Sequence, residues 1–149
     1  MSSLTPTFHA RAERIHREHE VIEQTLADLE LNLERMTTHP ENGEPAGMVC
    51  RSGRELAKVL PPHCKREEED LHDVVADVSP QLQEFTRLMK EQHQTLMARL
   101  NEFVAVLQTF ESNPGAPGGR EMLIQEGKSL VRDIRRHVAT EETELKGFL

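Results

Sequence analysis

Pairs of histidine and glutamate recur in this sequence at a spacing that suits metal coordination. His63 and Glu67 are four residues apart, and so are His137 and Glu141. On a helix this spacing places both side chains on one face, so each pair directs an imidazole and a carboxylate toward the same point. Imidazole nitrogens and carboxylate oxygens are common ligands of transition metals. The two pairs are therefore the first candidates for chemistry.

Helices are the elements expected to position these pairs. Clusters of turn residues at 39–45, 79–80 and 112–119 divide the 149-residue chain into four segments. Each segment is rich in Leu, Glu, Arg, Gln and Ala and is ~28–33 residues long, which favours helix over strand. Four long helices with short links predict an all-α, up-down-up-down antiparallel four-helix bundle, with residues 1–149 as a single domain. The predicted helices are roughly Phe8 to Thr37, Pro45 to Val78, Gln81 to Glu111 and Gly119 to Gly147.

An apolar face runs along each predicted helix. Its residues recur mostly at intervals of three, four or seven, the pattern of one buried helical face. Pro61 and Pro62 interrupt the second helix, where the loss of two amide donors predicts a kink or a restart. The faces comprise Ile15, Ile22, Leu26, Leu29, Leu33 and Met36; Val49, Leu56, Leu60, Leu71, Val74 and Val78; Leu82, Phe85, Met89, Leu96, Leu100, Phe103, Leu107 and Phe110; and Leu123, Leu130, Ile134, Leu145 and Phe148.

Each apolar face has one gap, and polar residues fill every gap. In antiparallel helices these gaps fall at about the same height, so their side chains are expected to form one cluster. The remaining histidines lie off the faces or in a turn and are expected to be solvated; they are His9, His16, His39 and His72. The gap residues are His19, His63, Glu67, His93, His137 and Glu141.

A bound cation explains this cluster better than ordinary core histidines do. A single buried histidine is usually hydrogen-bonded to a neighbour, but here that explanation must hold four times. Six ionisable groups at one level each have a desolvation cost of several kcal/mol, and no Lys or Arg occupies the gaps to neutralise the carboxylates. A metal stabilises the ionised carboxylates and the neutral imidazoles, and it cross-links the helices.

The donor set favours two iron ions over a closed zinc site. Two carboxylates can bridge a pair of metals, with His19 and His93 completing one metal each. Four nitrogens and two bridging carboxylates suit a non-haem di-iron centre, and manganese or zinc are substitutes. Six protein groups cannot fill two octahedral shells, so positions remain for oxo, hydroxo, water or a small exogenous ligand.

Taken together, these motifs resemble the hemerythrin-like, HHE cation-binding family over nearly the whole chain. The shared pattern is an inward histidine on the first helix, HCKRE at 63–67, EQH at 91–93 and HVATE at 137–141. The resemblance implies a four-helix bundle with a carboxylate-bridged di-iron centre, whose relatives carry, store or sense O2 or handle nitric oxide, peroxide or iron. By position, it implies that His19 and His63 ligate one iron, His93 and His137 the other, and that Glu67 and Glu141 bridge.

One position departs from the pattern of the oxygen carriers. Carriers have H-x-x-x-H on the third helix, but the residue four after His93 is Met97. The missing imidazole leaves a vacancy or a water at the His93 iron, which favours reactivity toward peroxide or NO over reversible O2 carriage. Glu23 and Glu68 are lesser ligand candidates. A ferritin-type pair at Glu69 and His72 has no matching partner on the fourth helix.

Composition excludes several other classes of function. Eighteen Lys and Arg against 26 Asp and Glu give a net charge of −8, which opposes nucleic-acid binding. No apolar run suits a membrane span or a secretory signal, so we expect a cytoplasmic protein. Cys50 and Cys64 are then expected to be reduced thiols, with Cys64 packed or partly exposed. The run KREEED at 65–70 is expected to be a solvated face apart from Glu67.

Three functions remain open from the sequence. The leading one is a di-iron protein that binds or reacts with O2, peroxide or NO, as a sensor, a carrier or a peroxide-scavenging enzyme. The second is an iron-sensing or interaction module in which the metal is mainly structural. The third is a metal-free helical adaptor with a histidine pH switch.

Overall fold

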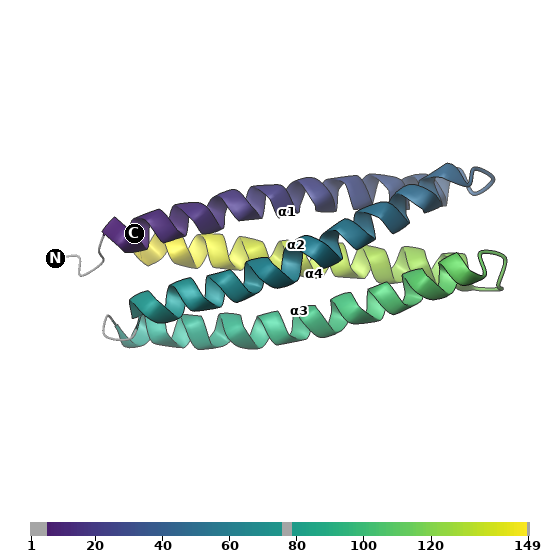
Figure 1. The fold of residues 1–149 in the computed structure, drawn as a ribbon. Helices are drawn as coiled ribbons and strands as arrows, with labels where there is room; N and C mark the ends of the chain where they lie inside the picture. The colour runs from purple at the N-terminus through teal and green to yellow at the C-terminus, as the bar shows by residue number, and fades with distance from the viewer. Residues whose placement is uncertain (1–5, 76–78, 149) are drawn as a thin grey trace.

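Long antiparallel helices build the whole of the described chain. The computed structural model describes residues 6–75 and 79–148, with side chains for residues 8–71 and 79–147. Consecutive helices run in opposite directions, and the last returns to lie beside the first (Figure 1). The predicted all-α four-helix bundle is confirmed. Within the described residues the helices are α1 (Pro6–Thr38), α2 (Glu44–Val75), α3 (Pro80–Ser112) and α4 (Gly119–Phe148).

Turn residues end the helices close to the predicted boundaries. Ser79 caps α3 by accepting the N–H of Leu82 at 3.0 Å, and Pro80 follows at a position where its missing N–H costs nothing. The Asn42 side chain accepts the N–H of Glu44 at 2.9 Å at the start of α2. Just before α4, Gly118 has a φ of 77°, a conformation that glycine adopts without strain. The predicted end of the second helix, at residue 78, lies outside the described residues.

The proline pair does not break α2. The helix continues through Pro61 and Pro62, so the expected restart of the helix is wrong, while a kink stays a prediction. Pro61 and Pro62 lack the amide donors that would bond to the carbonyls of Ala57 and Lys58. Lys58 is exposed and Ala57 is half-buried, so water can reach this side of the helix and satisfy the freed carbonyls.

The predicted apolar faces are buried wherever their side chains are described, and they form two separate clusters. The larger cluster includes Leu33 and Phe103 and extends toward the links between α1 and α2 and between α3 and α4. The smaller cluster lies where α1 begins and α4 ends, at the same end of the bundle (Figure 1). The predictions for Val74, Val78 and Phe148 concern side chains outside the described residues. The smaller cluster contains Phe8, Ala12, Ile15, Leu71, Leu82, Phe85, Met89 and Leu145.

Two glycines allow neighbouring helices to approach closely within the larger cluster. A Cβ atom added to Gly53 would lie 2.6 Å from Leu107 Cδ1 and 2.9 Å from the Phe103 ring. A Cβ atom added to Gly127 would lie 2.9 Å from both terminal carbons of Leu33. Neither position has room for a side chain without displacing its neighbours.

The outer surface of the bundle is mainly polar. Exposed large apolar side chains are scattered over α1, α3 and α4; they are Val21, Leu31, Leu88 and Met122. None of the described helices is long and apolar enough to cross a membrane.

Candidate metal centre

All the residues predicted to face inward meet at one level of the bundle, between the two apolar clusters. Each of the four helices contributes a histidine, and α2 and α4 also contribute a glutamate one turn further on. Their exposed fractions are 7% or less: His19 3%, His63 3%, Glu67 1%, His93 2%, His137 7% and Glu141 0%. The structure thus brings together every residue of the predicted site and leaves none outside.

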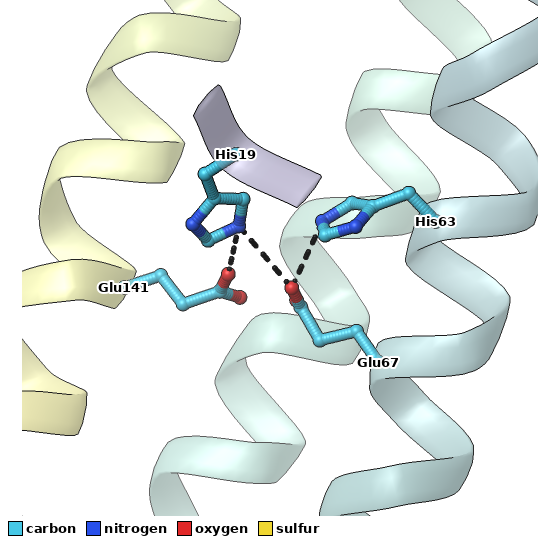
Figure 2. Close-up of side chains that lie close together, drawn as sticks. All are labelled: His19, His63, Glu67 and Glu141. Atoms are coloured by element: carbon cyan, nitrogen blue, oxygen red, sulfur yellow. Dashed lines mark ion pairs between the residues drawn. The ribbon is translucent and has the colours of Figure 1, made fainter. Parts of the chain in front are cut away.

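One half of this cluster lies between α1 and α2. Nε2 of His19 is 2.7 Å from Oε1 of Glu141 and 3.3 Å from Oε2 of Glu67. Nε2 of His63 is 3.0 Å from the same Oε2 of Glu67. Figure 2 shows these four side chains pointing toward one another from three helices. We call this set of two histidines and the carboxylate oxygens that face them the His19 half.

The other half lies between α3 and α4, and we call it the His93 half. Nε2 of His93 is 2.9 Å from Oε1 of Glu67 and 4.0 Å from Oε2 of Glu141. Nε2 of His137 is 3.6 Å from Oε2 of Glu141. Each carboxylate therefore turns one oxygen toward the His19 half and the other toward the His93 half. This is the arrangement expected of two carboxylates shared between two metal ions.

The donor atoms fit a metal better than they fit one another. In each half, one atom from each of four residues lies within 4.8 Å of the others. Several of these distances are short, but most of the inward atoms are not oriented to form hydrogen bonds with one another. Buried polar atoms without a hydrogen-bond partner are rare in folded proteins. One cation in each half would satisfy all of these atoms. The atoms left without a hydrogen bond are His19 Nε2, His93 Nε2, His137 Nε2 and both carboxylate oxygens of Glu67 and of Glu141.

The two buried carboxyl groups have pKa values that move in opposite directions. Burial raises the pKa of Glu141, and the neighbouring Glu67 carboxylate raises it further, well above its ordinary value. Burial also acts to raise the pKa of Glu67, but contacts with Glu141 and with the histidines outweigh it and hold that pKa well below its ordinary value. Without metal, Glu67 is therefore the ionised member of the pair and Glu141 retains a proton.

The imidazoles are also unequal without metal. Burial lowers the pKa of His19, but the carboxyl groups of Glu141 and Glu67 outweigh it and raise that pKa to about 10. For His93, burial is likewise outweighed, by contacts with Cys64 and Glu67 that raise the pKa to about 11. Burial and the charge on His93 lower the pKa of His137 to about 4. The cluster thus compensates its buried charge with protons that a metal would have to displace.

A second set of residues orients the imidazoles from outside. Every inward histidine donates its Nδ1–H to a side-chain oxygen of an adjacent helix, which fixes the ring and directs Nε2 to the centre. We call these partners the outer acceptors. The distances are 2.7 Å from His63 to Glu18, 2.9 Å from His93 to Glu68, 2.7 Å from His137 to Gln92 and 2.8 Å from His19 to Glu142.

The outer acceptors form a closed circuit around the bundle. Each helix supplies an acceptor to the histidine of the next helix, and α4 supplies the histidine of α1. On α1 and α3 the acceptor directly precedes the inward histidine, whereas on α2 and α4 it directly follows the inward glutamate. Each step of one residue along an α-helix rotates the side-chain direction by about 100°. The sense of this rotation reverses when the helix runs the other way. A preceding residue on α1 or α3 and a following residue on α2 or α4 therefore point the same way around the bundle.

These contacts correct part of the sequence analysis. The run at 65–70 is not all solvated: Glu68 is half-buried against His93, and Asp70 accepts a hydrogen bond from Arg14. Glu23 is on the outer surface, where it pairs with Arg135 at 2.8 Å, and makes no contact with the cluster. Of the histidines expected to be solvated, His9, His16 and His39 are exposed, and the side chain of His72 lies outside the described residues.

Met97 and Cys64 lie beside the His93 half without belonging to it. Met97 is half-buried and packs against the larger apolar cluster. Cys64 is buried, and burial raises the pKa of its thiol. Both residues line a cavity of about 630 Å³ between α2 and α3. Cys50 is likewise buried, and both cysteines are free thiols.

Comparison with known proteins agrees with this geometry. Residues 10–149 match the family model described as the hemerythrin HHE cation binding domain. No curated protein and no solved structure gave a significant match. The matched region includes all four helix segments that supply the buried histidines and glutamates. The chain belongs to the hemerythrin HHE cation-binding family.

Proposed function

We propose that this protein binds two iron ions in the buried cluster, one in the His19 half and one in the His93 half, and that small molecules such as O2, peroxide or NO bind or react there. The observation that carries the proposal is the sharing of both carboxylates: each of Glu67 and Glu141 presents one oxygen to each half. A single ion would leave half of these oxygens without a partner. Iron supplies redox chemistry and open coordination positions to such ligands.

The protein's own residues have distinct roles in this proposal. Glu67 and Glu141 supply the negative charge that balances the metals, and the four imidazoles present Nε2 as neutral donors. The outer acceptors keep each Nδ1 protonated, so that Nε2 remains free to coordinate. The two apolar clusters lie above and below the site and limit the access of water along the bundle axis.

Composition and thiol chemistry support the remaining parts of the proposal. Both buried cysteines are free, which favours a reducing compartment, and we propose the cytoplasm. A net charge of −8 opposes nucleic acid as a partner.

Metal content tests the proposal directly. Purified protein grown with iron should contain two iron ions per chain, and Glu67→Ala and Glu141→Ala should each lose most of that iron because each removes a donor from both halves. Glu23→Ala and Glu69→Ala are matched controls, since both side chains are exposed, and they should keep it. Equal losses in all four variants, or one iron per chain in well-loaded protein, would contradict the proposal.

The optical spectrum provides an independent test. The chain contains no Trp and no Tyr, so the protein itself absorbs little near 280 nm. Near-ultraviolet bands of the oxidised protein should therefore come from ligand-to-iron charge transfer and should disappear on complete chelation. Bands that survive chelation would show that they have another origin.

A mainly structural metal in an iron-sensing module is the second candidate. It is favoured by the position of the cluster, which separates the two apolar clusters and joins all four helices. In that case removal of iron should unfold the smaller cluster, while iron-loaded protein should leave O2 and peroxide unchanged. The leading proposal instead predicts spectral changes when these ligands are added.

A further inference from the structure

Two cavities reach inward histidines from outside the bundle. The cavity between α3 and α4, of about 480 Å³, is lined by His137 together with Gln92, Leu88 and Arg136. The cavity between α1 and α2, of about 350 Å³, is lined by His63. A small ligand in the first cavity therefore meets a histidine of the His93 half, and one in the second meets a histidine of the His19 half. The cavity between α2 and α3 is lined by Cys64 and Glu68 but by none of the inward histidines.

The two cavities differ in what covers the histidine. At the α1 and α2 cavity, the outer acceptor is the carboxyl group of Glu18, which is also bound by the Arg66 guanidinium at 3.1 Å, so His63 lies behind an ion pair. At the α3 and α4 cavity, the outer acceptor is the uncharged amide of Gln92, and among the described residues no charged side chain is hydrogen-bonded to that amide. His137 is also the most exposed of the six inward residues, at 7%. Displacing an amide costs less than opening an ion pair.

The cavity between α3 and α4 also presents a free positive charge. Its acidic side chains are each paired with an arginine: Asp133 with Arg99 at 2.9 Å and Glu91 with Arg87 at 2.5 Å. Arg136 has no ion pair among the described residues, although it lines the same cavity. In a chain with a net charge of −8, such a cation locally favours an anion.

We propose that small anions reach the metal centre through the cavity between α3 and α4, past Gln92 and His137, and that Arg136 attracts them. The inference rests on the proposed function, because it requires a metal in the His93 half. The ligand class is a monoanion of two or three heavy atoms, such as hydroperoxide, nitrite or azide. Gln92 and Arg136 act as residues that set access and charge, and neither needs to touch the metal.

Azide binding to the iron-loaded protein tests the route. Leu88→Trp places a bulky side chain in the proposed cavity, and Val21→Trp does the same in the cavity between α1 and α2; both native side chains are exposed, at 41% and 57%. Leu88→Trp should slow azide association about tenfold or more, and Val21→Trp by less than about twofold, because only the first narrows the route. Each variant contains a single Trp, whose emission reports that the protein is folded.

Charge variants on the surface provide a second measurement that does not depend on packing. Arg136→Gln should weaken azide binding roughly threefold to tenfold, whereas Lys58→Gln, which removes a cation from the cavity between α1 and α2, should change it by less than about twofold. Slower association in Val21→Trp than in Leu88→Trp, or equal effects of the two charge variants, overturns the route while leaving the proposed function intact. Wild-type protein that holds only one iron overturns the proposed function, and this inference with it.

Discussion

Glu67 and Glu141 are identical side chains with similar burial, yet only one of them is readily ionised in the absence of metal. The reason is their proximity, since two carboxylates that share a low-dielectric site cannot both hold a negative charge without a cation. Glu67 is surrounded by three histidines and stays ionised, whereas Glu141 takes the proton. Once metal is bound, both carboxylates would be ionised. The two residues whose pKa values are shifted in opposite directions without metal are therefore the ones whose charges a metal would stabilise.

Substitution of Met97 tests whether the His93 half has an open coordination position where the oxygen carriers have a histidine. It lies one turn after His93, so Met97→His should place a further imidazole on that side and occupy a coordination position. We expect the variant to change the iron bands, to slow peroxide decay and to weaken azide binding about tenfold or more. Spectra, peroxide decay and azide titration of iron-loaded protein measure these effects.

Met97→Leu is the matched control, because it keeps the apolar volume and adds no donor; its cost in stability should stay below about 1.5 kcal/mol. If Met97 only fills the core, as its contact with the larger apolar cluster allows, then Met97→His will lower stability without altering the iron bands or peroxide decay. That result would contradict the open coordination position, and reversible O2 binding would then be as well supported as reactivity toward peroxide or NO.

The helices and the inward residues could be predicted because both follow from the period of the α-helix. Apolar side chains at steps of three and four define one face, and a polar residue at a face position must point inward too. Thus His19, which replaces an apolar residue between Ile15 and Ile22, is identified by position alone. The structure places it at 3% exposure in the centre of the bundle.

The outer acceptors could not be recognised in the same way. Glu18 and Glu142 lie one position from an inward residue, at the edge of the buried face, where an acid is usually solvated. Whether such a side chain reaches a histidine depends on which helix packs beside that edge, and this is a property of the bundle. The sequence does contain a pattern that would identify them. An acid or amide directly precedes the inward histidine on α1 and α3, and an acid directly follows the inward glutamate on α2 and α4.

Close helix packing around Phe103 leads to a prediction about Gly127. Alanine is the better helix former by about 1 kcal/mol, but a Cβ atom at Gly127 would lie 2.9 Å from Leu33. We expect Gly127→Ala to lower the free energy of unfolding by roughly 1–3 kcal/mol through overpacking. Gly47→Ala, where nothing lies within 4 Å, should be neutral or stabilising. Chemical denaturation of both variants measures the difference, and a stabilised Gly127→Ala would show that α1 and α4 can separate at little cost.

The bundle as a whole has a layer of ionisable groups where an apolar core would otherwise be continuous. The six inward residues separate the smaller apolar cluster from the larger one. In the metal-free protein this layer is held by protons on imidazole and carboxyl groups, and in the loaded protein by metal. The two forms therefore respond to pH in opposite ways.

We expect the stabilisation by metal to grow as pH rises above neutral. His19 and His93 have folded pKa values of about 10 and about 11, above their ordinary value of about 6.5. The stability they contribute to metal-free protein is fully present below about pH 6.5 and is lost as pH rises through about 10 to 11. Metal binding needs both imidazoles neutral, so metal affinity rises over the same range.

Thermal unfolding of loaded and chelated protein between about pH 6.5 and pH 9.5 measures this effect. The gap between the two Tm values should widen with pH by several degrees, and metal uptake near neutral pH should release protons. A gap that stays constant, together with metal uptake that releases no protons, would show that the two imidazoles are neutral before metal binds.

The placement of the two chain ends has a mechanical consequence. α1 begins and α4 ends at the same end of the bundle (Figure 1), so a force that pulls these ends apart peels α1 from α4 one contact after another instead of sliding the helices past each other. The smaller apolar cluster, where Phe8 and Leu145 lie, is the first to bear the load. Next in line is the layer where His19 of α1 lies 2.7 Å from Glu141 of α4. A metal held there would cross-link α1 to α4. The force needed to separate α1 beyond His19 would then depend on whether iron is bound.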